Sequence, residues 1–215
     1  MDLSVFLTLS ELVGTIAFAV SGVLVAKKQK LDLFGAVVLG LFTAVGGGVL
    51  RDILLGNTPP VMFRKPVYAM TALVTSSIVF YIEKRSRLME DSAKMVFVLN
   101  VADTVGLGVF AVSGTEMVLH SGHRENLFLA LFVGVITAVG GGMIRDMLAG
   151  RVPIVMRKRI YAVAALLGAA LYYLLRDRGK LEIFAAELIT VAIVGLIRFA
   201  AIHYQLNLPS FDEED

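Results

Sequence analysis

An Arg-Asp pair occurs twice in this chain, each time inside an apolar stretch. Arg51 and Asp52 follow three glycines in "TAVGGGVLRDILLG", and Arg145 and Asp146 follow three glycines in "TAVGGGMIRDMLAG". A charge at the centre of a membrane span costs about 2.5–3.5 kcal/mol on insertion scales, which disfavours a lipid-facing position. The four side chains are therefore expected to face protein or water. Two roles fit them equally: a structural pairing that pins their helices, and the lining of a permeation path.

Matched acids and hydroxyls accompany these pairs. Glu11 and Asp103 each stand three residues before a glycine in an apolar segment. A carboxylate at that depth attracts a cation, takes up a proton or pairs with an arginine. The hydroxyls either bond back to a carbonyl of their own helix, which is the more common arrangement, or line a hydrophilic path. They form two matched pairs, Ser21 with Ser113 and Thr43 with Thr137.

The glycine runs are unusual for apolar segments. Three glycines cost a helix roughly 3 kcal/mol relative to alanine, and they leave the backbone uncovered. One interpretation is a kink or break whose backbone groups line a polar path, since such groups survive at membrane depth only against protein or water. The alternative is close packing, because small residues let helices approach one another in lipid. Symmetric duplication favours the break, at Gly46, Gly47, Gly48, Gly140, Gly141 and Gly142.

Several other chemistries are excluded. The glycines lack the Lys-Ser/Thr of a phosphate-binding loop, and no strand precedes them. The three histidines do not form a metal site, and no nucleophile stands beside a base. The chain has no cysteine, which excludes disulfides and thiol chemistry. We therefore expect no enzymatic activity, no catalytic residue, no metal and no cofactor. The net charge of +2 is too small to indicate a nucleic-acid partner.

Long apolar segments must position these residues. The chain is 57% hydrophobic and only 18% charged, whereas soluble domains are about 25% charged. Blocks of about 20 apolar residues span a hydrocarbon core about 30 Å thick. The sequence predicts an all-α integral membrane protein with the lipid bilayer as its surroundings. Its transmembrane helices would be seven, at roughly 3–26, 32–56, 66–82, 95–119, 126–150, 159–175 and 183–204.

The segments contain an internal repeat. The two glycine motifs share ten of fourteen positions, "FAVSG" at 18–22 recurs at 110–114, and "RKPVYA" at 64–69 corresponds to "RKRIYA" at 157–162. The repeat unit holds three segments, an odd number, so the second copy enters the membrane from the opposite side. This predicts inverted repeats related by a two-fold axis in the membrane plane. The units are residues 1–92 and 93–180, and residues 181–215 add a seventh helix and an acidic tail within one integral domain.

The inverted arrangement places the motif charges. Antiparallel packing of the second and fifth segments brings both glycine runs near the middle of the membrane. At about 1.5 Å per residue, each arginine lies roughly 6 Å beyond its glycines, on opposite sides of the centre. Arg51 is therefore expected to meet groups on its own side of the membrane rather than Asp146.

Loop charges predict the orientation. The loops that follow the first, third and fifth segments carry eleven lysines and arginines, and the other three loops carry six. The positive-inside rule assigns the richer set to the cytoplasm. We predict a multi-pass protein of the inner or plasma membrane, with its amino terminus outside and its carboxyl terminus in the cytoplasm.

The doubled "GGG-x-x-RD", with a seventh helix appended, resembles the prokaryotic branch of the trimeric intracellular cation (TRIC) channel family, also catalogued as glycine-transporter-like. The resemblance covers about residues 5–204. It implies a homotrimer with one pore in each protomer, between the first, second, fourth and fifth helices and constricted at the glycine kinks. It also implies permeation of K⁺ or Na⁺, chiefly K⁺, with bound lipid as a further partner. The basic motif by which animal members bind phosphoinositide is missing, so lipid gating is not carried over.

Other functions remain open at this point. Inverted repeats with broken helices are equally typical of secondary transporters, here of a small zwitterion such as glycine. A scaffold that transports nothing would explain packing glycines, but not their placement beside charges in both halves.

Overall fold

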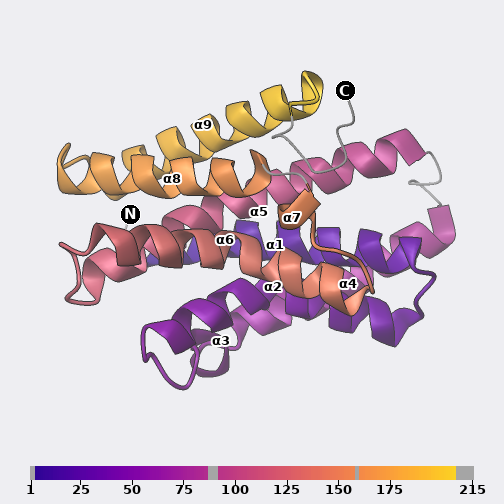
Figure 1. The fold of residues 1–215 in the computed structure, drawn as a ribbon. Coiled ribbons are helices and arrows are strands. Elements are labelled where there is room, and N and C mark those ends of the chain that lie inside the picture. Colours follow the sequence, from indigo (N-terminus) through magenta and orange to yellow (C-terminus); the bar gives the residue numbers. More distant parts are fainter. Residues whose placement is uncertain (1–2, 87–91, 158–159, 207–215) are drawn as a thin grey trace.

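The computed structural model of the chain describes residues 3–86, 92–157 and 160–206, and within these residues it contains helices and no strand (Figure 1). The acidic tail that the sequence singles out, residues 208–215, lies outside the described residues. The predicted all-α class is therefore confirmed for the part of the chain that the structure describes.

Every predicted segment corresponds to a long helix, and the ends differ by a few residues. Of these helices, six are long and apolar enough to cross a membrane, and α4 is the exception among the described residues. Two further helices of one turn each were not predicted, α3 (Val61–Arg64) and α7 (Ile154–Arg157). The long helices are α1 (Leu3–Lys28), α2 (Leu33–Leu54), α4 (Val67–Ser86), α5 (Ser92–His120), α6 (Leu127–Leu148), α8 (Ile160–Asp177) and α9 (Ile183–His203).

Local signals explain where α2 and α6 begin and end. Asp32 and Asn126 precede the two helices, and each side-chain oxygen accepts a hydrogen bond from the amide three residues later, at 2.8 and 3.0 Å. Such caps satisfy one of the amides that a helix start leaves unpaired. Gly56 and Gly150 follow the two helix ends with φ of 67° and 66°. Glycine adopts this left-handed conformation without strain, so the last residue of each matched motif ends its helix.

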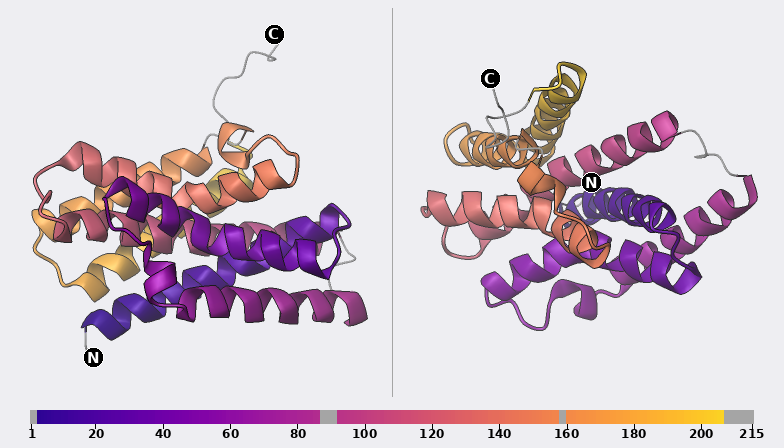
Figure 2. Two further views of the ribbon diagram at one scale, coloured as in Figure 1. Left: turned by 90° about the horizontal axis from the view of Figure 1, so that it is seen from below. Right: turned by 45° about the vertical axis from the view of Figure 1, so that its right-hand side comes forward.

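Four helices form the inner part of the bundle. α2 packs against α6, α1 against α2 and α5, and α5 against α6. α4 covers α1 and α2 on one flank, whereas α8 and α9 cover α5 and α6 on the other (Figures 1 and 2). The short helices α3 and α7 follow α2 and α6, and each contacts the long helix that precedes it. The elements that carry the candidate residues thus meet at the centre of the molecule.

The predicted breaks in the second and fifth segments are wrong. Both glycine runs lie inside continuous helices, α2 and α6. A methyl group at Gly47 would overlap the carbonyl oxygen of Thr137, and one at Gly141 would overlap that of Thr43. The glycines therefore let the two backbones touch where the helices cross. Packing against the neighbouring helix outweighs the low helix propensity of glycine, which is a weak preference that tertiary contacts override.

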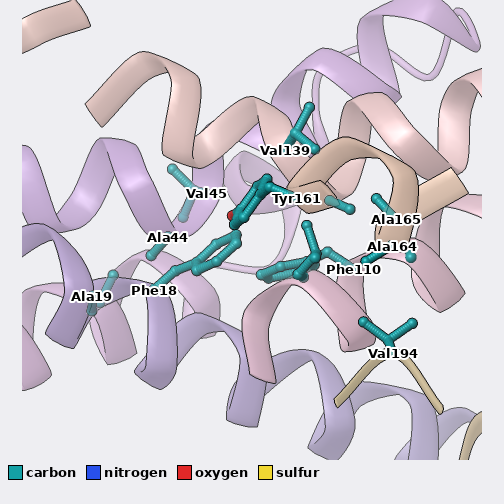
Figure 3. Packing of buried hydrophobic residues seen from close by; sticks show 14 residues of the cluster. Phe18, Ala19, Ala44, Val45, Phe110, Val139, Tyr161, Ala164, Ala165 and Val194 are labelled. Carbon is teal, nitrogen blue, oxygen red and sulfur yellow. The ribbon is translucent and has the colours of Figure 1, made fainter. Parts of the chain in front are cut away.

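Where α1 and α5 meet, a phenylalanine of each helix packs on a glycine of the other helix. The Phe18 ring packs over Gly106, and the Phe110 ring packs over Gly14. The two rings lie side by side with centroids 5.3 Å apart (Figure 3). Both belong to an apolar cluster that also holds Val45 from α2, with alanines and valines of the neighbouring helices. A dry aromatic layer thus fills the middle of the four inner helices.

Candidate functional site

One network of charged side chains lies beside the first glycine motif. Arg51 donates from Nη1 to Ser113 Oγ at 2.7 Å and to Glu11 Oε1 at 3.1 Å, and from Nε to Asp52 Oδ1 at 2.9 Å. Ser113 donates in turn to Glu11 Oε1 at 2.5 Å, and Tyr68 donates to Glu11 Oε2 at 2.6 Å. Side chains from four elements, α1, α2, α4 and α5, are therefore joined in one hydrogen-bonded network. Arg51 meets groups of its own end of the bundle, as expected.

A matching network surrounds the second glycine motif. Arg145 donates from Nη1 to Asp103 Oδ1 at 2.6 Å and from Nε to Asp146 Oδ1 at 3.0 Å. Ser21 donates to Asp103 Oδ1 at 2.6 Å and accepts from Arg145 Nη1. Tyr161, the counterpart of Tyr68, has no hydrogen-bond partner for its hydroxyl among the described residues. The side chain of Asp103 is one methylene shorter than that of Glu11, and for this reason it does not reach the Tyr161 hydroxyl.

The serines are exchanged between the two halves of the chain. Ser113 belongs to the second repeat but completes the network of Arg51, and Ser21 belongs to the first repeat but completes that of Arg145. The acids differ from the serines in this respect. Glu11 and Asp103 each form an ion pair with the arginine of their own repeat. Neither network is complete without a side chain from the other half.

The aspartates of the motifs also hold the short helices. The second carboxylate oxygen of Asp52 accepts from the amide of Val61 at 2.7 Å, and that of Asp146 accepts from the amide of Ile154 at 2.9 Å. These amides begin α3 and α7, where the helix leaves them unpaired. Each Arg-Asp pair thus ties the end of its long helix to the turn that follows.

The threonines take no part in either network. Thr43 donates to the carbonyl of Leu39 at 2.5 Å, and Thr137 donates to that of Val133 at 2.6 Å, each four residues earlier in its own helix. This is the local hydrogen bond that hydroxyls commonly make inside helices. Their carbonyls, at the α2–α6 crossing, are the groups that face the glycines.

The two networks differ in their access to solvent. The Glu11 side chain is 17% exposed, whereas that of Asp103 is 2% exposed. Glu11 and Arg51 stand at the inner end of a cavity of about 630 Å³, which α5 and α9 line from the other side. The cavity lies at the end of the bundle that holds α3. The first network is thus joined to a cavity of this size, and its acid is the more exposed of the two.

Several side chains of the site were not singled out from the sequence. Tyr68, Phe18 and Phe110 all lie in the matched stretches "RKPVYA" and "FAVSG", so their equivalence between repeats was a usable signal. Glu187 is a buried acid in α9 that lines the cavity. Its signal was a single carboxylate inside an otherwise apolar segment, which in a membrane span marks a candidate functional group.

No metal centre emerges from the described residues. They contain no group of three or more histidines, cysteines, aspartates and glutamates that could hold a metal ion. At the centre of the bundle Arg51 and Arg145 are each paired with two carboxylates. The arrangement provides buried polar groups at two levels, with an apolar layer between them.

Comparisons with known proteins agree with this architecture. A family model described as "Glycine transporter" matches residues 8–84 and 100–177. The chain is similar to the UPF0126 inner membrane protein YadS of Escherichia coli (strain K12), with 37% identity over 201 residues, 94% of each chain. A UPF0126 membrane protein of Vibrio cholerae is 37% identical over 205 residues, which are 95% of this chain and 82% of the relative.

Solved structures of cation channels share the fold. A structure from a study of conductance through TRIC cation channels matches with a TM-score of 0.83 and 32% identity, covering 100% of both chains. The TRIC orthologue from Rhodobacter sphaeroides gives 0.84 and 35%, over 94% of this chain and 99% of the other. A prokaryotic TRIC channel in 0.5 M KCl gives 0.85 and 33%, over 96% and 100%.

Proposed function

Since this chain belongs to the glycine-transporter family and is related over its whole length to TRIC cation channels, we propose that it conducts monovalent cations, chiefly K⁺. It is a multi-pass membrane protein, and its relative in Escherichia coli is an inner membrane protein. The permeation path would run inside each protomer between α1, α2, α5 and α6.

The observation that carries this proposal is the polar column at the centre of those four helices. Two arginine–carboxylate networks lie along it, and one of them stands at the inner end of a 630 Å³ cavity. Charged groups inside a membrane protein that face a cavity mark substrate and ion pathways. Glu11 and Ser113 supply oxygen atoms at the cavity end, as a cation requires.

Opening would separate the contacts that now close the middle. Phe18, Phe110 and the Gly47–Gly141 crossing lie between the two networks and leave an apolar constriction. An apolar constriction excludes water, and therefore ions, until it widens. We propose that α2 and α6 move apart at the glycines, where the two backbones touch.

The same proposal includes the larger architecture. α4 would be the remaining membrane span, making seven in all, and α1–α4 and α5–α8 would be inverted repeats that share a two-fold axis in the membrane plane. The glycines at the crossing would form the narrowest level of the path. The protein would assemble as a homotrimer, in which each protomer keeps its own pore.

A secondary transporter of a small zwitterion such as glycine is the second candidate. A cavity that leads from one end of the bundle to one of two matched networks fits a carrier that opens to one side at a time. The description of the family model, "Glycine transporter", points to the same class.

Ion flux into liposomes that hold the purified protein separates the two. A channel passes K⁺ down its gradient and shows unitary current steps in planar bilayers. A carrier accumulates radiolabelled glycine in a saturable way under an imposed Na⁺ or proton gradient, without such steps. Glycine uptake without K⁺ current would overturn the channel proposal.

A further inference from the structure

A buried carboxylate of α9 faces the cavity from outside the duplicated part of the chain. Glu187 stands four residues after the first residue of α9 and is 4% exposed. It lines the cavity together with Glu11 and Glu116. Its Oε2 atom is buried and has no hydrogen-bond partner among the described residues. Because α9 has no counterpart in the other repeat, this carboxylate has no matched partner at the opposite end.

The other two acids of the cavity have ion-pair partners, whereas Glu187 has none among the described residues. Glu11 pairs with Arg51 at 3.1 Å, and Glu116 pairs with Arg176 at 3.2 Å. In the described part of the chain no arginine or lysine forms an ion pair with Glu187, whose neighbour is the Ser10 hydroxyl. Glu187 is therefore the acid of the cavity wall that has no ion-pair partner among the described residues.

The remaining cations of the cavity do not reach this charge. Arg64 and Lys65 line the cavity from α3 and the turn after it, and Arg64 donates to the side chain of Asn57. α3 and α9 lie on opposite flanks of the bundle (Figure 1). His120 also lines the cavity, but it faces Glu116, with 3.4 Å between Nδ1 and Oε1. The wall near α9 is thus acidic and the wall near α3 is basic.

A buried ionised carboxylate needs a counter-charge, because removal from water without one costs several kcal/mol or more. We propose that Glu187, with the Ser10 hydroxyl, binds a monovalent cation in the cavity. One unpaired negative charge matches one positive charge. The described residues hold no cluster of three acids or histidines, so the site is not suited to a divalent metal.

The site makes the two ends of the path unequal. Cations that enter through the cavity meet the Glu187 carboxylate first, and cations that enter from the opposite end do not. A carboxylate at a pore entrance raises the local concentration of cations, and salt screens this effect. Its effect on current rests on the proposed channel function, whereas the binding of the cation does not.

A thermal-stability titration tests the binding. Purified protein in detergent is heated at constant ionic strength while K⁺ replaces N-methyl-D-glucamine, a cation too large for the site. A ligand that binds only the folded state raises the unfolding midpoint in a saturable way. We expect this rise in the wild type and in Glu182→Gln, which removes the exposed acid that precedes α9, and its loss in Glu187→Gln. Glu187→Asp keeps the charge and should keep a weaker response.

Three results would overturn the site. They are an equal K⁺ response in Glu187→Gln, no K⁺ response in the wild type, and an infrared carbonyl band of a protonated acid at neutral pH that disappears in Glu187→Gln. The last result would mean that a proton, rather than a metal cation, neutralises the side chain.

Current measurements test the consequence. In planar bilayers at low salt, Glu187→Gln should lower the current of cations that enter from the cavity end more than the reverse current, and high salt should abolish the difference. Equal loss in both directions contradicts the proposed effect. A wild-type protein that binds K⁺ in the titration but carries no current would refute the channel function while supporting the site.

Discussion

At the scale of single residues, the serine hydroxyls of the two arginine networks should differ in how much they contribute to stability. Ser21 lies in a fully buried network, whereas Ser113 shares its acid with Tyr68 and with the cavity. Water can replace a lost hydroxyl only where it can enter. The same chemical group should therefore contribute differently to stability in the two halves.

Replacing the two serines by alanine measures this difference. Ser21→Ala leaves Arg145 and Asp103 with an unfilled hydrogen-bonding position that water does not reach, which costs about 1–3 kcal/mol. Ser113→Ala should cost less, about 0.5–1.5 kcal/mol, because the cavity supplies water. The check is the thermal unfolding midpoint of each variant in the same detergent. An equal drop in both, or a larger drop in Ser113→Ala, would show that access to the cavity does not matter.

The matched tyrosines offer a second comparison. Tyr68→Phe removes the hydrogen bond to Glu11, measured at 2.6 Å, and should destabilise the protein by about 0.5–1.5 kcal/mol. Tyr161→Phe removes a hydroxyl that has no partner in the described structure and keeps the ring under Arg198, whose guanidinium carbon lies 4.7 Å from the ring centroid. Its unfolding midpoint should stay close to that of the wild type. A large loss in Tyr161→Phe would indicate a partner for this hydroxyl.

At the scale of the elements, adjacent glycines of one run differ in how closely they pack against the neighbouring helix. Gly47 faces the α6 backbone, whereas an added methyl group at Gly48 would come no closer than 3.9 Å to Arg51. Gly142 is similarly open, with 3.5 Å to the Tyr161 hydroxyl. The helix crossing therefore depends on the middle glycine of each triplet, and the third glycine is needed less for packing.

Alanine substitution separates the two tasks. Gly47→Ala places a methyl group against a backbone carbonyl that cannot rotate away, and overpacking of this kind costs about 1–3 kcal/mol. Gly48→Ala should be neutral or stabilise the helix by up to about 1 kcal/mol. The measurement is again the unfolding midpoint, with the elution profile as a check on assembly. If Gly48→Ala were the more harmful change, the third glycine would have a role other than packing.

At the scale of the whole molecule, the orientation of the bundle in the membrane determines the side to which the cavity opens. Thr8 and Ser10 of α1 and Val61 and Arg64 of α3 line the cavity, so these parts of the two helices lie at the cavity end. If the loop charges orient the protein as predicted, the cavity opens to the outside and the carboxyl terminus lies in the cytoplasm.

Reporter fusions test this orientation. A reporter joined after Asp215 that works only in the cytoplasm should be active, and one that works only outside should be silent. The physical reason is the excess of lysine and arginine in the loops at the end opposite the cavity. The inverse pattern would place the cavity in the cytoplasm.

Light scattering of the detergent complex gives the protomer number from multiples of 23.2 kDa, and three is expected.

Much of this fold could be predicted from the sequence. Segment positions follow from hydropathy, and the pairing of each acid with an arginine was among the alternatives for Glu11 and Asp103. The glycine run was misjudged, since propensity treats Gly47 alone and cannot include the α6 backbone against which it packs. Tyr68 and Glu187 carried sequence signals, a matched stretch and a lone carboxylate in an apolar segment, but their partners lie on other helices. Those contacts exist only after the chain has folded.

The exchanged serines carry an implication for how such a chain could arise. A single three-helix unit, expressed alone, would hold an arginine and an acid but would lack the hydroxyl that its partner half supplies. It could rebuild the full set of bonds only by associating with a second copy of itself inserted the other way up. An ancestor of this kind would have needed to enter the membrane in both orientations. If the two repeats are inverted as proposed, fusion of two copies into one polypeptide would fix one orientation for each half and would let Glu11 and Asp103 diverge into unequal roles.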